Sequence, residues 1–246
     1  MLLKFLIIMF SLSATSSAWS LERITVAFGD ALAPWVMPDT HNGIILDILT
    51  EALEPVGYEI EPIYYPYLRR ITEYKNGFVD VACDMNANTI KDQNLRGFLS
   101  DDAYAYENFA FTLKEKGYQF KHLNELGNLS LLSWQGAISH LGDEYAEMAK
   151  NNPFYFETDR QESQIQMLFL KRVDVVQLDK QIFSYFRSKV GQKGVIDTTV
   201  EVDSFALFGK SPNGFLFRDE KIRDEFNRQL KRLKDSGRYE AILNRY

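Results

Sequence analysis

The segments NGFVDVACD, residues 76–84, and LKRVDVVQLDK, residues 170–180, repeat one phrase in two distant parts of the chain. In each segment a basic or glycine-containing turn is followed by a short run of apolar residues that ends at an acid. Short β-branched runs bounded by turn residues are typical of strands buried in a sheet. A repeat at such a long distance predicts two similar lobes and not a solenoid of short repeats.

Helix-like and strand-like patterns alternate along the rest of the chain. The spacing of apolar residues predicts, in order, strand 23–28, helix 43–57, strand 58–65, helix 67–77, strand 79–83, strand 107–114, strand 128–133, helix 135–151, helix 161–172 and strand 173–178. A strand-like segment at 204–210 and an amphipathic helix pair at 218–246 close the chain. This order predicts an α/β fold in which each lobe is a mostly parallel sheet flanked by helices.

The N-terminal segment, residues 1–18 (MLLKFLIIMFSLSATSSA), has the features of a secretory signal peptide. One Lys precedes a short apolar stretch, and the small residues Ser16 and Ala18 stand where a signal peptidase would cut. The stretch is far shorter than the roughly 20 apolar residues that a membrane-spanning helix needs. We expect cleavage before Trp19, a periplasmic location and no integral membrane span afterwards; an uncleaved N-terminal anchor is the alternative.

The composition argues against several classes of partner and site. The chain has a formal net charge of -6, 46% hydrophobic residues and no block of clustered Lys and Arg. Nucleic acid is therefore not an expected partner, because phosphate contacts need clustered basic side chains. The single cysteine, Cys83, stands in an apolar strand pattern, so we expect a buried, inert thiol.

Three acids, Asp30, Asp84 and Asp179, each stand at the end of an apolar strand pattern. In open α/β sheets, ligands bind beyond the carboxyl ends of the strands, where loops converge. We therefore expect these three carboxylates to face a cleft and not a core, as candidate ligand-binding residues.

The order of the segments resembles the periplasmic solute-binding proteins of bacterial amino-acid uptake systems, the family 3 extracellular binding proteins. The resemblance covers nearly the whole mature chain and rests on seven segments: VAFGDALAPW (26–35), NGIILDIL (42–49), YKNGFVDVACDMNANT (74–89), FLSDDAYAYENFAF (98–111), SWQGA (133–137), KRVDVVQLD (171–179) and LKDSGRYEAILNRY (233–246). It implies the type II periplasmic binding protein fold, with two hinge strands between a first lobe, residues 19–107 and 203–246, and a second lobe, residues 108–202.

The resemblance also implies roles for three residues. Asp179 matches the position at which amino-acid binders hold the ammonium group of the ligand, and a carboxylate suits that role because it accepts charge-assisted hydrogen bonds. The alternative for Asp179 is a cap for the helix that follows it. Tyr67 matches an aromatic residue that stacks over the ligand, with a packed core tyrosine as the alternative. Trp35 matches an aromatic residue that supports the wall of the cleft.

The chain departs from the family pattern at the clamp for the ligand carboxylate. Relatives place an arginine after the third strand, but here that position falls on Asp92 or Gln93, and the next arginine is Arg96. Arg96 stands about one helical turn later, so it is either a displaced clamp or a solvated side chain. Asn86 and Asn88 still offer hydrogen bonds in this loop. The chain therefore keeps the scaffold and, at Asp179, a site for an ammonium group, but it departs from the family at the position that binds the carboxylate of an ordinary α-amino acid.

Two further segments carry groups that could face the ligand. Either Arg69 or Arg70 could turn into the cleft toward an anion, although a surface ion pair with Glu73 is the favoured alternative. On the other lobe, the start of the helix expected at 135–151 offers amide groups that favour an anion or a carbonyl oxygen. The candidate residues there are Trp134, Gln135 and Gly136; for the tryptophan, packing in a core is the alternative.

No pattern in the sequence indicates catalysis, a metal or a cofactor. The three histidines lack metal-ligand spacing, and there is no nucleophile elbow, P-loop or dinucleotide-binding glycine run. We therefore expect a binding protein and not an enzyme, without catalytic residues, metal or cofactor. It would close over a small polar solute, amino-acid-like or a related amine or acid, and deliver it to an ABC-type permease of the inner membrane. The alternatives are a solute-sensing module for a membrane receptor and, less favoured, a dehydratase of prephenate-like acids.

Overall fold

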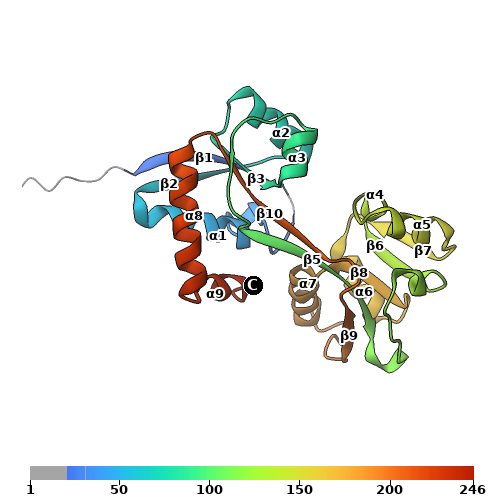
Figure 1. Cartoon of the computed structure of the whole chain (residues 1–246). Helices are drawn as coiled ribbons and strands as arrows, with labels where there is room; N and C mark the ends of the chain where they lie inside the picture. Colours follow the sequence, from blue (N-terminus) through green and yellow to red (C-terminus); the bar gives the residue numbers. More distant parts are fainter. Residues whose placement is uncertain (1–20, 31) are drawn as a thin grey trace, which may run out of the picture.

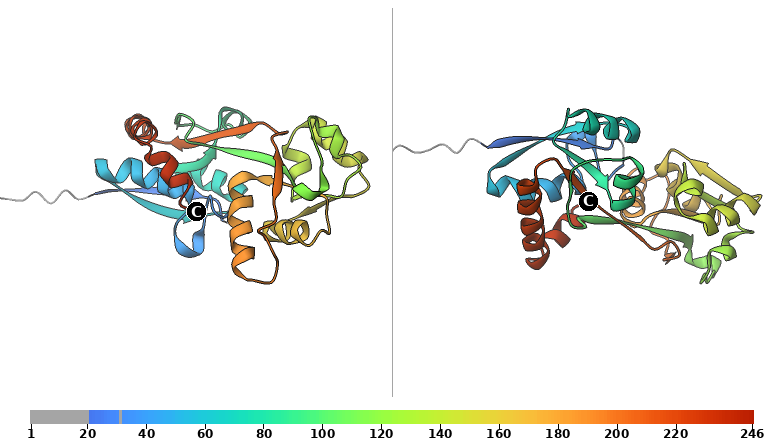
Figure 2. Two further views of the ribbon diagram at one scale, coloured as in Figure 1. Left: turned by 90° about the horizontal axis from the view of Figure 1, so that it is seen from below. Right: turned by 45° about the horizontal axis from the view of Figure 1, so that its top comes forward.

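The computed structural model describes residues 21–30 and 32–246, which form two lobes joined by crossing strands (Figure 1). The predicted signal peptide, residues 1–18, lies outside the described residues. Each lobe combines a sheet with helices, so the predicted two-lobed α/β fold is confirmed. Views from other directions show the same separation of the lobes (Figure 2).

The first lobe is built around a parallel sheet. β1 (Glu22–Phe28) lies between β2 (Tyr58–Tyr64) and β3 (Val81–Met85) and pairs in parallel with both. The other elements of this lobe are the short strand β4 (Phe98–Leu99) and the helices α1 (Ile44–Leu53), α2 (Tyr67–Asn76), α3 (Ala87–Asp92), α8 (Glu220–Asp235) and α9 (Arg238–Leu243). Apolar side chains of α1 and α8 belong to one buried cluster with β1, and those of α2 belong to a second.

The second lobe repeats this plan with shorter strands. β6 (Leu131–Trp134) lies between β7 (Tyr155–Thr158) and β8 (Val175–Asp179) and pairs in parallel with both. The other elements are α4 (Ala137–His140), α5 (Asp143–Asn151), α6 (Gln161–Phe169), α7 (Lys180–Gln192) and β9 (Val202–Phe205). One helix was expected over 135–151, but the structure has two, because the backbone at Gly142 turns to a φ of 92°.

Two antiparallel strands, β5 (Tyr104–Leu113) and β10 (Lys210–Phe217), cross between the lobes. The first half of β5 pairs with β10, and from Asn108 onward β5 pairs with β8 and β9 of the second lobe. The full order is β2-β1-β3-β10-β5-β8-β6-β7, with β4 paired to β10 and β9 paired to β5. Because β9 pairs within the second lobe, we place the return crossing at residues 206–209, later than the boundary at 202/203 expected from the sequence.

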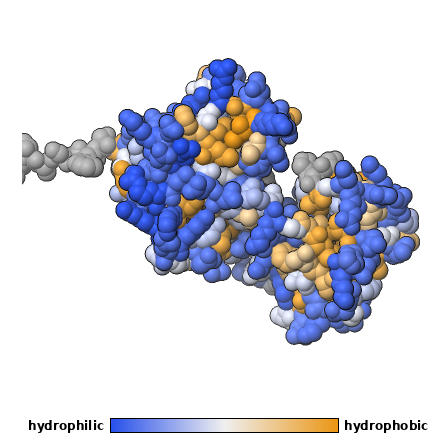
Figure 3. All heavy atoms as spheres, in the orientation of Figure 1, coloured by the Kyte–Doolittle hydropathy of each residue, from blue (hydrophilic) through white to orange (hydrophobic). Residues whose placement is uncertain are grey.

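One face of the molecule is largely hydrophilic. On the face shown in Figure 3, hydrophilic residues cover most of both lobes and apolar residues appear in separate patches. The long helix α8 fits this picture, because its apolar residues Phe226 and Leu230 are buried against β10 while its charged residues face outward. Within the described residues, no helix has both the length and the apolar character to cross a membrane.

Candidate ligand-binding site between the lobes

A pocket of about 420 Å³ lies between the lobes on one face of the crossing strands. We call it the inter-lobe pocket. Side chains on β5 and β10 alternate between the two faces of these strands, and those that face the pocket are Tyr106, Asn108, Ser211 and Asn213. The other described residues that line it are Leu32, Arg70, Asp84, Asn86, Thr89, Trp134, Leu141, Gln161, Asp179 and Ile182. Both lobes therefore contribute to one concave site, whose surface is mostly apolar with several polar side chains.

Asp179 joins the two lobes at this pocket. It ends β8 and caps α7, and its Oδ1 accepts hydrogen bonds from the backbone amides of Gln181 (2.9 Å) and Ile182 (3.2 Å). The same oxygen accepts a bond of 2.8 Å from Nε1 of Trp35 in the first lobe. Oδ2 accepts a bond of 2.8 Å from the backbone amide of Glu107 on β5. Asp179 is thus a helix cap, one of the two roles expected for it, and it also borders the pocket.

The charge of Asp179 is hydrogen-bonded but not neutralised. Asp179 is only 4% exposed, and this burial raises the pKa of its carboxyl group. The hydrogen bonds from Trp35 and the backbone amides oppose the rise. All four donors described for Asp179 are electrically neutral groups. A buried carboxylate that lacks a cationic partner attracts a cation strongly, because folding has already removed it from water and binding adds little further desolvation cost for it.

Trp35 supports the wall of the pocket. The indole is 2% exposed and packs against the rings of Tyr104, at a centroid distance of 5.8 Å, and Tyr106, at 4.9 Å. The Trp35 side chain therefore fixes the position of Asp179 from the first lobe while the two tyrosines fix the indole. This placement agrees with the supporting role that the family resemblance implies for Trp35.

Arg70, on the first turn of α2, turns into the inter-lobe pocket. Successive residues of a helix point about 100° apart, so neighbouring arginines face different surroundings. Arg69 is exposed and pairs with Glu73 at 3.2 Å, as the favoured surface alternative predicted. That alternative is wrong for Arg70, which is 3% exposed and donates from Nη1 to Asp84 at 2.6 Å and to Sγ of Cys83 at 3.1 Å.

Arg70 and Asp84 form a buried ion pair that two tyrosines hold in place. The hydroxyls of Tyr104 and Tyr106 donate to Oδ1 of Asp84 at 2.8 and 2.7 Å, while Arg70 occupies Oδ2. Burial by itself would raise the pKa of Asp84, but the Arg70 charge and the two hydroxyls outweigh it and lower the pKa. Burial likewise opposes the charge on Arg70, and the neighbouring carboxylate keeps the pKa of the guanidinium above its ordinary value. Both groups are therefore charged at neutral pH.

The amide groups at the start of α4 already donate hydrogen bonds to a carboxylate of the protein. Glu157 on β7 accepts hydrogen bonds from the amides of Gly136 (2.8 Å) and Ile138 (3.0 Å). The hydroxyl of Tyr155 donates to the same carboxylate at 2.6 Å. The expectation that these amides would face an anionic part of the ligand therefore needs correction, because the side chain of Glu157 fills that position.

The structure brings four of the predicted residues together at the inter-lobe pocket: Asp84, Asn86, Trp134 and Asp179. Asn86 caps α3 through its Oδ1 and donates from Nδ2 to Asn213 on β10 at 3.2 Å. Trp134 ends β6 at the pocket and also packs on the apolar cluster of the second lobe, so the wall and core alternatives both apply.

The remaining predicted residues lie elsewhere or have no described side chain. Asp30, Arg96 and Gln135 are exposed and are not among the described residues that line the pocket. Arg96 follows α3 and does not line the pocket, whereas Arg70 is the arginine among the described lining residues. Asn88 is exposed and lines an adjoining surface pocket of about 550 Å³. The side chain of Tyr67, which begins α2, lies outside the described part of the structure.

Several lining residues were not predicted, chiefly Tyr106, Asn108, Gln161 and Asn213. A signal for two of them exists in the segment YAYEN, residues 104–108, where polar aromatic and amide side chains recur at every second position of the expected strand. An apolar core face would not carry such residues. For Gln161 and Asn213 the sequence offers no comparable signal.

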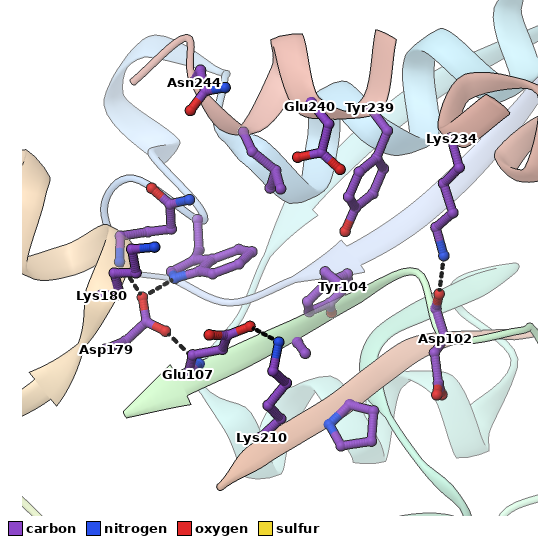
Figure 4. Close-up of a pocket in the computed structure, with 15 residues that line it drawn as sticks. Asp102, Tyr104, Glu107, Asp179, Lys180, Lys210, Lys234, Tyr239, Glu240 and Asn244 are labelled. Atoms are coloured by element: carbon purple, nitrogen blue, oxygen red, sulfur yellow. Dashed lines mark hydrogen bonds and ion pairs between the residues drawn. The ribbon is translucent and has the colours of Figure 1, made fainter. Parts of the chain in front are cut away.

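A second and larger space, of about 940 Å³, lies on the opposite face of the crossing strands, and we call it the hinge-back cavity. Figure 4 shows α8 and α9 of the first lobe on one side of it and the start of α7 on another. Its walls carry charges of both signs, including an ion pair between Lys210 and Glu107 and a hydrogen bond of 2.7 Å from Lys234 to the carbonyl of Asp102. Asp179 borders this cavity as well as the inter-lobe pocket.

Cysteine and metal chemistry find no support among the described residues. Cys83 is fully buried, and burial raises the pKa of its thiol to about 12, so the thiol stays protonated and inert at neutral pH. In the part of the chain that the structure describes, no group of three or more His, Cys, Asp or Glu residues is placed to hold a metal ion.

Solved structures of other proteins share the fold of this chain. An ancestral cationic amino acid solute-binding protein superposes with a TM-score of 0.70 at 16% identity, covering 91% of this chain and 95% of that chain. An amino acid ABC transporter substrate-binding protein from Streptococcus pneumoniae, bound to L-arginine, has a TM-score of 0.62 at 16% identity, with coverages of 91% and 93%. A histidine kinase sensor domain with similarity to periplasmic binding proteins also has a TM-score of 0.62 at 16% identity, with coverages of 90% and 94%.

At these identities the solved structures show a shared fold alone. A comparison with curated protein sequences found no match to this chain. The family model for bacterial extracellular solute-binding proteins, family 3, matches residues 24–246, which is nearly all of the described chain. The chain therefore belongs to the bacterial extracellular solute-binding proteins of family 3.

Proposed function

We propose that the protein binds a small polar solute that carries a cationic nitrogen, in the inter-lobe pocket, by closing its two lobes in the periplasm. The observation that supports this most is the Asp179 carboxylate, which borders the pocket while all its described donors are neutral. Its Oδ2 accepts a single described hydrogen bond, so a solute N–H has room to approach that oxygen. Tyr106 and Trp134 offer aromatic surface to the remainder of the solute.

Delivery to an ABC-type permease is the proposed use of the bound solute. Lobe closure shifts an equilibrium between open and closed forms, and the closed form gives a membrane partner a surface to recognise. Support comes from the family and from the likeness to a transporter substrate-binding protein. Presentation of the solute to a membrane receptor is the second candidate, supported by the likeness to a histidine kinase sensor domain.

Dehydration of a prephenate-like acid is a weaker alternative. The ancestral solute-binding protein named above is described as a precursor of cyclohexadienyl dehydratase. Such a reaction needs a positioned proton donor. Asp84 does not suit that role, because Arg70 and two tyrosine hydroxyls keep it ionised. We therefore favour binding without catalysis.

A thermal-shift screen of amines, polyamines, amino acids and small organic acids tests the proposed function. A solute present at ~100 times its dissociation constant should raise the free energy of unfolding by ~2.7 kcal/mol, because it binds the folded state alone. We expect the strongest hits to carry a cationic nitrogen. Strong hits confined to organic acids without such a nitrogen would contradict the proposal.

Solute affinity should depend on pH through Asp179. A cationic solute needs the ionised carboxylate, and burial has raised the pKa of that group above its ordinary value of 3.8. Protonation therefore sets in at a higher pH than for an ordinary aspartate, and below that pKa the affinity should fall by about tenfold per pH unit. Asp84, whose pKa is lowered, stays ionised through the same range. Isothermal titration calorimetry between neutral and acidic pH measures this, and an affinity that stays constant down to the ordinary pKa would contradict it.

A further inference from the structure

The charges at the inter-lobe pocket limit which cationic solutes fit. Among the described lining residues, Arg70 is the one basic side chain, and Asp84 and Asp179 are the acids. The charges of Arg70 and Asp84 cancel, because Nη1 of Arg70 lies 2.6 Å from Oδ2 of Asp84. The negative charge of Asp179 then remains, and a solute with a single positive charge would balance it.

A carboxylate on the solute would meet an unfavourable position at Arg70. The guanidinium already pairs with Asp84, whose side chain is 17% exposed and is held by Tyr104 and Tyr106. A second carboxylate on the same guanidinium would lie close to Asp84, and like charges in contact cost several kcal/mol in a desolvated site. Asp84 cannot turn away easily, because it would leave the two hydroxyls and Arg70 without their acceptor.

The second position that could receive a carboxylate is also filled. The amides of Gly136 and Ile138 donate to Glu157, which sits at 2.8 and 3.0 Å from them. Glu157 is in turn fixed by the hydroxyl of Tyr155. The amide pair and Glu157 are not among the described residues that line the inter-lobe pocket, so Arg70 is the charged lining group that would attract a carboxylate from the solute, and the protein supplies its own carboxylate there through Asp84.

We propose that the solute is an amine with one positive charge and no carboxylate, such as the decarboxylated counterpart of an amino acid. This inference rests on the proposed function and narrows its solute class. The cationic nitrogen binds Asp179, and a short apolar or aromatic body contacts Leu32, Tyr106 and Ile182. The α-amino acid with the same body is excluded by the carboxylate of Asp84, which occupies the guanidinium of Arg70 at the pocket.

Pairs of compounds that differ only by the α-carboxylate test this inference. Calorimetric titration of the full mature chain with 2-phenylethylamine and L-phenylalanine, tyramine and L-tyrosine, and 3-methylbutylamine and L-leucine gives a dissociation constant for each. We expect the amine of the best-binding pair to bind at least ~10-fold more tightly than its amino acid. If the amino acid binds equally or more tightly, the inference is overturned.

The variant Asp84→Asn provides a second readout. It removes the competing negative charge and keeps the shape of the side chain, so affinity for the amino acid of the same pair should rise by ~10-fold or more, while the amine loses its preference. Asp80→Asn is the matched control, because Asp80 is exposed, adjoins the other end of β3 and does not line the pocket among the described residues. A variant that does not fold leaves the comparison of wild-type pairs to decide.

Failure of this inference can be told apart from failure of the proposed function. If amino acids bind better than amines and their binding depends on Asp179, the proposed cation site stands and the exclusion of carboxylates is wrong. If neither class binds, or if hits bind equally well without the Asp179 charge, the proposed function fails along with the inference.

Discussion

Replacing Arg70 by methionine is expected to lower the free energy of unfolding by about 3–5 kcal/mol, because it leaves Asp84 as a buried charge without its cation. Methionine keeps much of the side-chain volume, so loss of packing contributes little to the effect. Urea denaturation followed by circular dichroism measures the change.

Arg69→Met is the matched control for this variant. Arg69 stands next in sequence on the same helix, but it is exposed and its pair with Glu73 is a surface pair. Surface pairs of this kind contribute about 0.2–1 kcal/mol, so the control should lie close to the wild type. Equal effects of the two substitutions would show that the ion pair at the pocket does not stabilise the fold.

The pH dependence of the stability difference between wild type and Arg70→Met separates the effect of the lost charge from an effect of lost packing. In the wild type the pKa of Asp84 is lowered on folding, so its contribution to stability is present above the ordinary aspartate pKa and is lost as the pH falls through the folded value. Without Arg70 this contribution is removed. The difference in stability between wild type and Arg70→Met should therefore shrink on acidification.

Replacing Asp179 by asparagine is expected to weaken binding of the strongest solute hit by about 30-fold or more, equivalent to at least ~2 kcal/mol. The substitution removes the charge that a cationic solute needs. The fold should tolerate it, because asparagine caps helices about as well as aspartate and its Oδ1 still accepts the hydrogen bonds from Trp35, Gln181 and Ile182, although the bond from the Glu107 amide to Oδ2 is lost. Calorimetric titration of wild type and variant with the same solute gives the ratio.

Asp219→Asn controls for the cap. Asp219 caps α8 with hydrogen bonds from the amides of Lys221 (2.7 Å) and Ile222 (3.2 Å), the same arrangement that Asp179 makes at α7. It is exposed and does not line the inter-lobe pocket among the described residues. The control should bind the solute with unchanged affinity. Unchanged affinity in Asp179→Asn as well would remove the cation site from the proposal.

Much of the fold could be predicted because the spacing of apolar residues and the positions of the turn residues indicate the same helices and strands. Gly57 and Gly77 end the helical turns before β2 and β3, as expected, and both have positive φ angles. β10 was missed because its segment, KSPNGFLF, contains serine, proline, asparagine and glycine in succession, which are turn residues by local preference. It becomes a strand because β5 and β3 pair with it on its two sides. Tertiary pairing of this kind has no local signature.

The candidate site was harder to predict than the fold. Asp84 and Asp179 were found because the ends of parallel strands gather at one edge of a sheet. The choice between Arg70 and Arg96 depended on which arginine meets the carboxylate of Asp84, a distance that sequence spacing does not give. Glu157 was missed for a similar reason, since it reaches Gly136 only because β6 and β7 pair with Ser133 opposite Glu157.

The ribbon formed by β5 and β10 has an open space on each side, the inter-lobe pocket and the hinge-back cavity. Because the two spaces lie on opposite faces of this ribbon, a rotation of the lobes about it that narrows one space widens the other. A larger side chain in the hinge-back cavity would therefore favour the form in which the inter-lobe pocket is closed. A covalent link across the hinge-back cavity would favour the open form. Either change would tune affinity from a place that the solute never touches.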